Sequence, residues 1–217
     1  MPLRKRIHTT VSDEFPALVT KKDSQIRRTI AAEAARIMST QSLSNYRVAK
    51  QKAAERLGVN LRTSLPSNAE VENALRAYQK IYGGKHHFDH LQNKRKAALS
   101  VMRALESFHP RLVGPVLTGT ADKHARVTLH VFNDPPDEVV MHLLDKGLIF
   151  RNQQRKIRWH DGTYRLVQLL VTNADDVEVE LTLFNSMDLR QAPPSPIDGR
   201  PQKRAPISEV ERLLAGI

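Results

Sequence analysis

The sequence predicts an α+β protein, with a helical bundle in its first half and a mixed β-sheet, covered by helices on one face, in its second. Apolar residues recur at three- and four-residue spacing up to about Pro110, which is typical of helices, and then alternate with polar residues, which is typical of strands. The charge divides at the same place, because residues 1–110 hold 20 Lys and Arg against 9 Asp and Glu, whereas residues 111–217 hold 14 of each. We therefore expect a partly disordered basic arm (1–22), a helical domain (23–110) and an α+β domain (111–217) that ends in a proline-rich strap.

Four helices are expected in the helical domain. They cover about residues 24–39, a segment that Ser42 or Ser44 caps and that ends at Leu57, a segment from Ser67 to the pair Gly83-Gly84, and about 90–108. Ser67 and Glu70 predict a capping box, in which each side chain accepts a hydrogen bond from the backbone N–H of the other residue. Gly58 suits the position after the second helix, since glycine adopts the left-handed conformation there without strain. Pro110 stops the fourth helix.

Five strands and two helices are expected in the second half. The strands cover about residues 112–117, 127–132, 149–157, 164–171 and 177–184, and the helices cover about 138–147 and 208–214. Asp161-Gly162 predicts a tight hairpin between the third and fourth strands. Ser208 and Glu211 predict a second capping box. Residues 190–204 are rich in Pro, Arg and Gln and predict an extended strap across the domain surface.

Composition excludes several kinds of protein. The chain has no cysteine, which excludes a disulfide framework, a thiolate zinc site and a cysteine nucleophile. No apolar run is long enough to span a membrane, and the basic N-terminal stretch lacks the apolar segment of a secretory signal. We therefore expect a cytoplasmic protein that has no membrane partner. Its net charge of +11 invites an anionic partner such as a nucleotide or a nucleic acid.

The order of the expected helices and strands over about residues 95–184 is informative. A helix leads into a short strand and the turn Gly119-Thr120, and then come an alternating strand with Thr128 and His130, a helix, and a later strand with Glu178 and Glu180. This order resembles the core of the DNA polymerase beta-like nucleotidyltransferase superfamily. The resemblance implies nucleotide binding, with the Gly-Thr turn at the phosphates and the alternating strand at the substrate. It also implies nucleotidyl transfer that uses Mg²⁺ held by carboxylates, here those of the two glutamates.

The sequence departs from this family at the metal site. Thr128 and His130 stand where the family carries two carboxylates, and neither a hydroxyl nor a neutral imidazole holds Mg²⁺ well. One expectation is a nucleotide-binding member that has lost the usual activity. Another is a rearranged site that uses Asp122 and Asp134 with a glutamate of the later strand. The ordinary structural alternatives are a histidine in the core or on the surface, and glutamates on a solvated face of the sheet.

The basic helical half predicts a different function, that of a non-enzymatic nucleic-acid-binding or protein-interaction module. Arg47, Lys50, Lys52 and Arg56 form a broad basic face on a helix that follows a short turn, as contacts with phosphates require. A solvated face of a small bundle is the ordinary alternative. The helical half is also a candidate interface for a homodimer.

Two smaller clusters are open to more than one interpretation. His86 and His90 are four residues apart, as in helical zinc-binding pairs, but Gly83-Gly84 favours a solvated turn between helices. Four cations of the strap could clamp an anion, although we expect the strap to be structural; they are Arg190, Arg200, Lys203 and Arg204.

Overall fold

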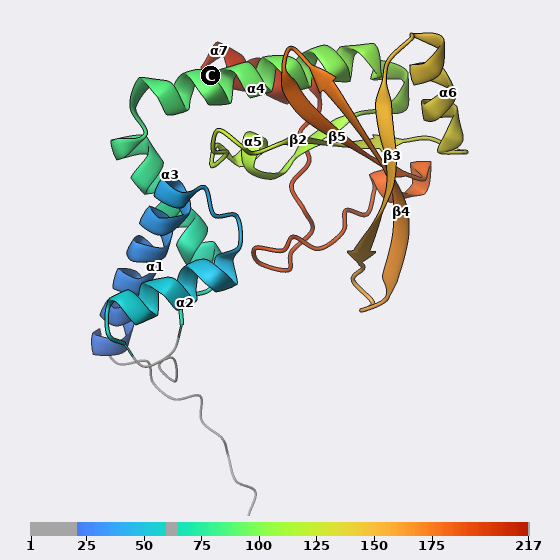
Figure 1. Cartoon of the computed structure of the whole chain (residues 1–217). Coiled ribbons are helices and arrows are strands. Elements are labelled where there is room, and N and C mark those ends of the chain that lie inside the picture. Colours follow the sequence, from blue (N-terminus) through green and yellow to red (C-terminus); the bar gives the residue numbers. More distant parts are fainter. Residues whose placement is uncertain (1–20, 60–64, 217) are drawn as a thin grey trace, which may run out of the picture.

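The computed structural model describes residues 21–59 and 65–216 (Figure 1), so the arm expected over 1–22 lies almost entirely outside the described residues. The α+β class is confirmed, because four helices precede a five-stranded mixed sheet that has helices packed against it. The four helices are α1 (Lys21–Gln41), α2 (Tyr46–Arg56), α3 (Asn68–Tyr82) and α4 (Gly84–Ala104). Within the described ranges, none of the helices combines the length and the apolar character needed to cross a membrane.

Helices α1, α2 and α3 enclose a core of their own. Its buried side chains include Ile30, Ile37, Ala49, Val71 and Leu75. The capping box of α3 is confirmed, since Ser67 Oγ accepts from Glu70 N at 3.2 Å and Glu70 Oε2 accepts from Ser67 N at 2.6 Å. The expected cap of α2 is wrong: Asn45, rather than Ser42 or Ser44, accepts a hydrogen bond from the first turn. An amide oxygen satisfies these N–H groups as well as a hydroxyl does.

A single glycine separates α3 from α4, and the expected solvated turn is wrong. Gly84 has a φ of +56° and α4 starts at the same residue, so residues 85–90, with His86 and His90, form the first turns of a helix. One left-handed residue is enough to redirect the chain. Helix α4 packs into the core of the sheet rather than into the core of α1–α3. The two cores thus divide at the α3–α4 junction, whereas the sequence analysis places the domain boundary at residue 110.

The sheet has the strand order β1-β2-β5-β4-β3. Its strands are β1 (Arg111–Val113), β2 (Val127–Phe132), β3 (Phe150–Arg158), β4 (Tyr164–Ala174) and β5 (Val177–Phe184). Strands β2 and β5 are parallel, and the other neighbours are antiparallel. The strand expected over 112–117 is wrong beyond Val113. Gly114, with a φ of +72°, turns the chain, and Pro115 then begins the short helix α5 (Gly114–Thr118).

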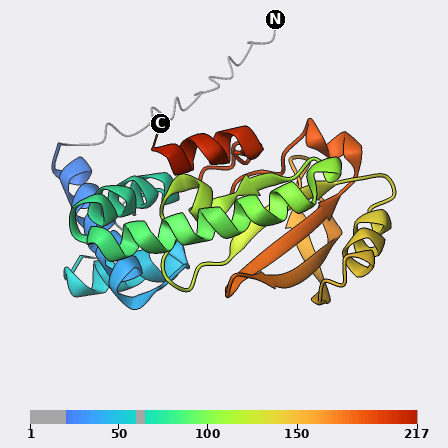
Figure 2. The same cartoon turned by 90° about the horizontal axis from the view of Figure 1, so that it is seen from above.

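Helices cover one face of the sheet, as the sequence predicts. Helix α6 (Asp137–Asp145) and helix α7 (Ile207–Ala215) join α4 and α5 there, around sheet residues such as Leu129 and Leu181. Figures 1 and 2 show α4 and α7 side by side over the strands. The second capping box is wrong, because α7 begins after Pro206 and Ser208 lies inside the helix.

Candidate functional site

Most of the residues singled out on the strands lie on the sheet face opposite these helices. Thr128 on β2 is the register partner of Glu180 on β5, and His130 is the partner of Thr182. Paired residues of neighbouring strands point to the same face, and residues two apart on one strand do so as well. Thr128, His130, Glu178 and Glu180 are therefore brought together on two adjacent parallel strands.

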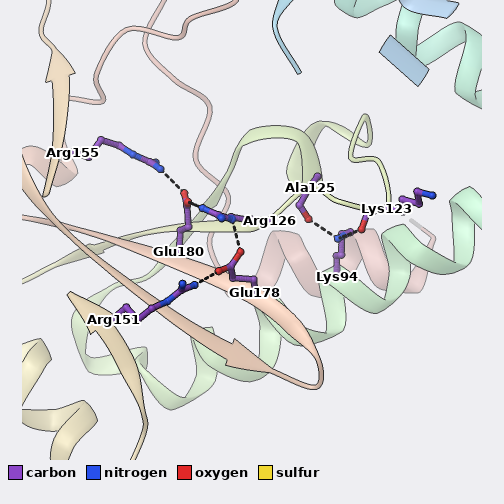
Figure 3. Close-up of polar contacts among 8 residues, drawn as sticks. All are labelled: Lys94, Lys123, Ala125, Arg126, Arg151, Arg155, Glu178 and Glu180. Carbon is purple, nitrogen blue, oxygen red and sulfur yellow. Dashed lines mark hydrogen bonds and ion pairs between the residues drawn. The ribbon is translucent and has the colours of Figure 1, made fainter. Parts of the chain in front are cut away.

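Arginines surround the two glutamates (Figure 3). Arg126 contacts both, with its Nη1 2.8 Å from Glu180 Oε1 and its Nε on Glu178 Oε2. From β3, Arg151 reaches Glu178 Oε1, and Arg155 Nη2 lies 2.7 Å from Glu180 Oε2. All four carboxylate oxygens therefore contact a guanidinium, and the cluster of three arginines and two glutamates keeps one excess positive charge.

These residues do not fit a divalent cation. Mg²⁺ needs several free oxygen ligands in octahedral geometry, and here arginines occupy the carboxylates that the resemblance assigns to the metal. Over residues 21–59 and 65–216, no group of three or more His, Cys, Asp or Glu side chains is arranged to hold a metal ion. Asp122 and Asp134 instead accept hydrogen bonds from backbone N–H groups, of His124 and Ser186 respectively.

Lys94 on α4 positions the loop that carries Arg126. Its Nζ donates to the backbone oxygens of Lys123 and Ala125 (Figure 3). Burial lowers the pKa of Lys94 from its usual value. Since Ala125 directly precedes Arg126, this contact ties the guanidinium between the two glutamates to the helix on the far side of the sheet.

His130 is buried and neutral. Its side chain is 3 % exposed, and burial, followed by the charges of Arg204 and Arg155, lowers its pKa to about 3. Nδ1 accepts a hydrogen bond from Arg204 Nε at 3.0 Å, so the single ring proton lies on Nε2. The Arg204 guanidinium also lies over the rings of Phe132 and Phe184, 4.8 and 5.4 Å from their centroids. Burial lowers the pKa of Arg204 to about 10.

The proline-rich segment forms the expected strap. Ser195 N donates to Arg200 O at 2.7 Å and Gln202 N donates to Pro193 O at 2.9 Å, which closes residues 193–202 into a hairpin. Beyond it, Ala205 pairs with Leu112 at the edge of the sheet. Of the four strap cations considered from the sequence, Arg204 binds the sheet and Lys203 pairs with Glu209 at 3.0 Å.

A cavity of about 840 Å³ lies between the strap and the sheet. Its wall includes Thr128 and His130 of β2, Thr182 of β5, Arg155 and Trp159 at the β3 end, and Ser195 of the strap. No carboxylate lines it among the described residues. The candidates Glu178 and Glu180 do not line it either, although Arg155 connects Glu180 to its wall.

Hydrogen-bond donors line this cavity without matching acceptors. The Trp159 side chain is 3 % exposed, and its buried Nε1–H has no hydrogen-bond partner. The hydroxyls of Thr128 and Thr182 and the Nε2–H of His130 likewise make no hydrogen bond with another described residue. Arg155 adds a guanidinium. A cavity that offers N–H and O–H groups and a positive charge suits a ligand rich in oxygen acceptors.

Gly119 and Thr120 do not line this cavity. The backbone N–H groups of Gly119, Thr120 and Ala121 all point to Pro115 O, at 2.9, 3.0 and 3.2 Å. Thr120 Oγ1 donates to the buried carboxylate of Glu72 at 2.9 Å. The turn therefore closes α5 and contacts α3, and its N–H groups are already used.

Glu72 on α3 links helices α1–α3 to this turn. Besides Thr120, the hydroxyls of Tyr46 and Thr118 donate to its carboxylate. Burial, followed by the hydrogen bond to Glu72, raises the pKa of Tyr46. Thr120 lines a second, smaller cavity at this junction, and Thr128 lines both cavities.

Most of the basic face on α2 is engaged within the molecule. Lys50 donates to Pro66 O and to Asn68 Oδ1, at 3.1 and 2.8 Å. Lys52 donates to Gln41, Arg56 pairs with Glu33 at 3.2 Å, and Arg47 is exposed. The phosphate contacts expected of this face would have to replace these interactions.

Sequence reasoning missed the arginines and the tryptophan of the site. A signal for the arginines exists, since Arg151 and Arg155, four residues apart on one strand, share a face, as Glu178 and Glu180, two apart on another strand, do. Pairing them requires the strand order, because β4 lies between β3 and β5. Trp159 directly follows β3, and no sequence motif includes it, so nothing in the sequence marked it as a site residue.

Comparisons with models of protein families, with curated proteins and with solved structures found no match. The resemblance to nucleotidyltransferases thus stays an expectation from the order of elements and the residues given above.

Proposed function

We propose that this protein binds a nucleotide, with its phosphates in the 840 Å³ cavity and without a divalent metal. The observation that carries the proposal is the buried, unpartnered Nε1–H of Trp159 in the wall of a cavity that Arg155 also lines. A buried donor without an acceptor costs about 1–3 kcal/mol, which a phosphate oxygen would recover. The order of elements that resembles nucleotidyltransferases supports the same ligand class.

In this proposal, guanidinium groups supply the positive charge that metal ions supply in the family that the chain resembles. Phosphate needs positive charge, and guanidinium groups supply it together with directed hydrogen bonds. We propose binding rather than nucleotidyl transfer, because every oxygen of Glu178 and Glu180 already contacts an arginine. A nucleic-acid-binding role for α2 has less support, since three of its four cations contact neighbours. The cytoplasmic location and the homodimer stay predictions.

Isothermal titration in EDTA tests this proposal, with ATP, GTP, CTP, UTP and inorganic tripolyphosphate as ligands. Arg155→Gln and Arg151→Gln form a matched pair, because both arginines lie on the same face of β3 and each variant leaves its glutamate paired with Arg126. We expect binding in EDTA, a loss of about tenfold or more in Arg155→Gln, and little change in Arg151→Gln.

Three results would contradict the proposal. They are the absence of heat with every ligand, binding that appears only when Mg²⁺ is added, and equal losses in the two variants. Equal losses would mean that Arg155 acts only on the general charge of the sheet.

A further inference from the structure

The second cavity, of about 360 Å³, lies where helices α1–α3 meet α5 and the start of β2. Leu43, Leu75 and Gln79 line it from the helical side, and Pro115 and Thr128 line it from the other. Thr128 lines both cavities, so the two are neighbours at this residue. A nucleotide that occupies both would have to pass beside the side chain of Thr128.

Gln79, a residue of this second wall, has a free acceptor. The residue is 5 % exposed, its Nε2 donates to Thr120 O at 3.2 Å, and its Oε1 is buried without a partner. Since a backbone carbonyl only accepts, the amide nitrogen must face Thr120, which leaves Oε1 as the free atom. A buried acceptor of this kind favours a ligand group that brings an N–H.

Apolar and polar residues both line the wall around Gln79. Met38, Leu43, Leu75, Pro115 and Ala125 are apolar, and the polar residues include Asp122, His124 and Arg126. The apolar side chains offer surfaces against which a ring-shaped ligand can pack. Among the buried unpartnered atoms, a donor (Trp159 Nε1) belongs to a residue of the larger cavity and an acceptor (Gln79 Oε1) to a residue of the smaller one.

We infer that the smaller cavity receives the base of the nucleotide, and that it selects a base with an exocyclic amine (adenine, cytosine or guanine) over one without it, through Gln79 Oε1. This inference rests on the proposed function, because the phosphates in the larger cavity hold the base in place. The amine donates to Oε1 and the ring packs between Leu75 and Pro115. A base without a donor at that position leaves Oε1 unpaired.

The test compares triphosphates that differ only in the amine. ATP is paired with purine riboside triphosphate, CTP with 2-pyrimidinone riboside triphosphate, and GTP with inosine triphosphate, by isothermal titration in EDTA on the full chain. We expect the amine to tighten binding about tenfold in at least one pair, which is the scale of one hydrogen bond to a buried group. In Gln79→Leu this ratio should fall to about one, while tripolyphosphate binds as in the wild type.

Gln92→Leu is the matched control. Gln92 also lies on a helix and has a buried, unpartnered Oε1, but it lines neither cavity. We expect this variant to keep the wild-type preference for the amine. Equal affinities within all three wild-type pairs would overturn the base assignment while nucleotide binding stands, and that comparison needs no variant. A lack of binding by tripolyphosphate and all nucleotides would overturn both proposals.

Discussion

The neutral state of His130 predicts how the protein loses stability in acid. Burial and the charges of Arg204 and Arg155 lower the pKa of His130 from 6.5 to about 3. As the pH falls through 6.5, the His130 imidazole takes up a proton in the unfolded chain, whereas in the folded protein it stays neutral until about pH 3. The free energy of unfolding is therefore undiminished by His130 above pH 6.5, and it falls progressively as the pH drops from 6.5 to about 3. With about 1.4 kcal/mol per pH unit, the folded state loses about 2 kcal/mol between pH 8 and pH 5 from this group alone.

Urea denaturation at pH 8 and pH 5 measures this loss. In His130→Asn the amide oxygen can accept from Arg204 Nε, and the side chain does not titrate. We expect the free energy of unfolding to fall about 2 kcal/mol less in His130→Asn than in the wild type. Any constant cost of the substitution cancels, because only the difference between the two pH values is compared.

His109→Asn provides the control, since His109 is exposed and its φ of +49° suits asparagine. The free energy of unfolding of His109→Asn should fall between pH 8 and pH 5 by as much as that of the wild type. If all three proteins lose the same free energy between pH 8 and pH 5, His130 is not held neutral by its surroundings and the reasoning fails.

Two further substitutions test the site and the fold. Glu180→Gln removes an anionic partner of Arg155, so tripolyphosphate should bind several-fold tighter in isothermal titration; an unchanged affinity would remove Arg155 from the phosphate site. Ser67→Ala removes half of the capping box of α3 and should lower the free energy of unfolding by about 1 kcal/mol in urea. Ser44→Ala, at a position that does not cap α2, should change it by less than about 0.5 kcal/mol, and equal effects would contradict the assigned caps.

Local signals predicted those parts of the fold that depend on neighbours in the sequence. The capping box at Ser67 and Glu70 is formed by residues three apart, and Gly58 adopts a φ of +64° after α2 as expected. The hairpin at Asp161-Gly162 joins β3 to β4, with Gly162 at a φ of +82°. In each case the physical cause lies within a few residues, so tertiary packing had little to override.

The errors arose where two local signals compete. Gly83-Gly84 is compatible with a loop or with one left-handed residue between two helices, and packing of α4 on the sheet favours the second. Serine is a common N-cap residue, so Ser208 was expected to cap α7. The helix begins earlier, directly after Pro206, whose ring fixes its φ angle. Composition alone does not rank such alternatives.

The candidate site was predictable in its strands but not in its contacts. Alternation placed Thr128 and His130 on one face, and Glu178 and Glu180 on one face, as the register now has them. The arginines that neutralise the glutamates come from β3 and from the loop before β2, and only the strand order brings them there. The unpartnered atoms of Trp159 and Gln79 are a property of packing and leave no mark in the sequence.

The position of the strap along the chain affects how the protein is made. The strands and helices α4, α5 and α6 precede residue 185, whereas α7 and the contacts of Arg204 with His130 and of Ala205 with Leu112 come later. During synthesis the sheet can thus pair its strands before the ribosome has added the segment that covers Phe132 and Phe184. Apolar surface left open on a partly finished chain invites aggregation. A chain that stalls or is cleaved before residue 204 would therefore leave the rings of Phe132 and Phe184 uncovered and be prone to aggregation.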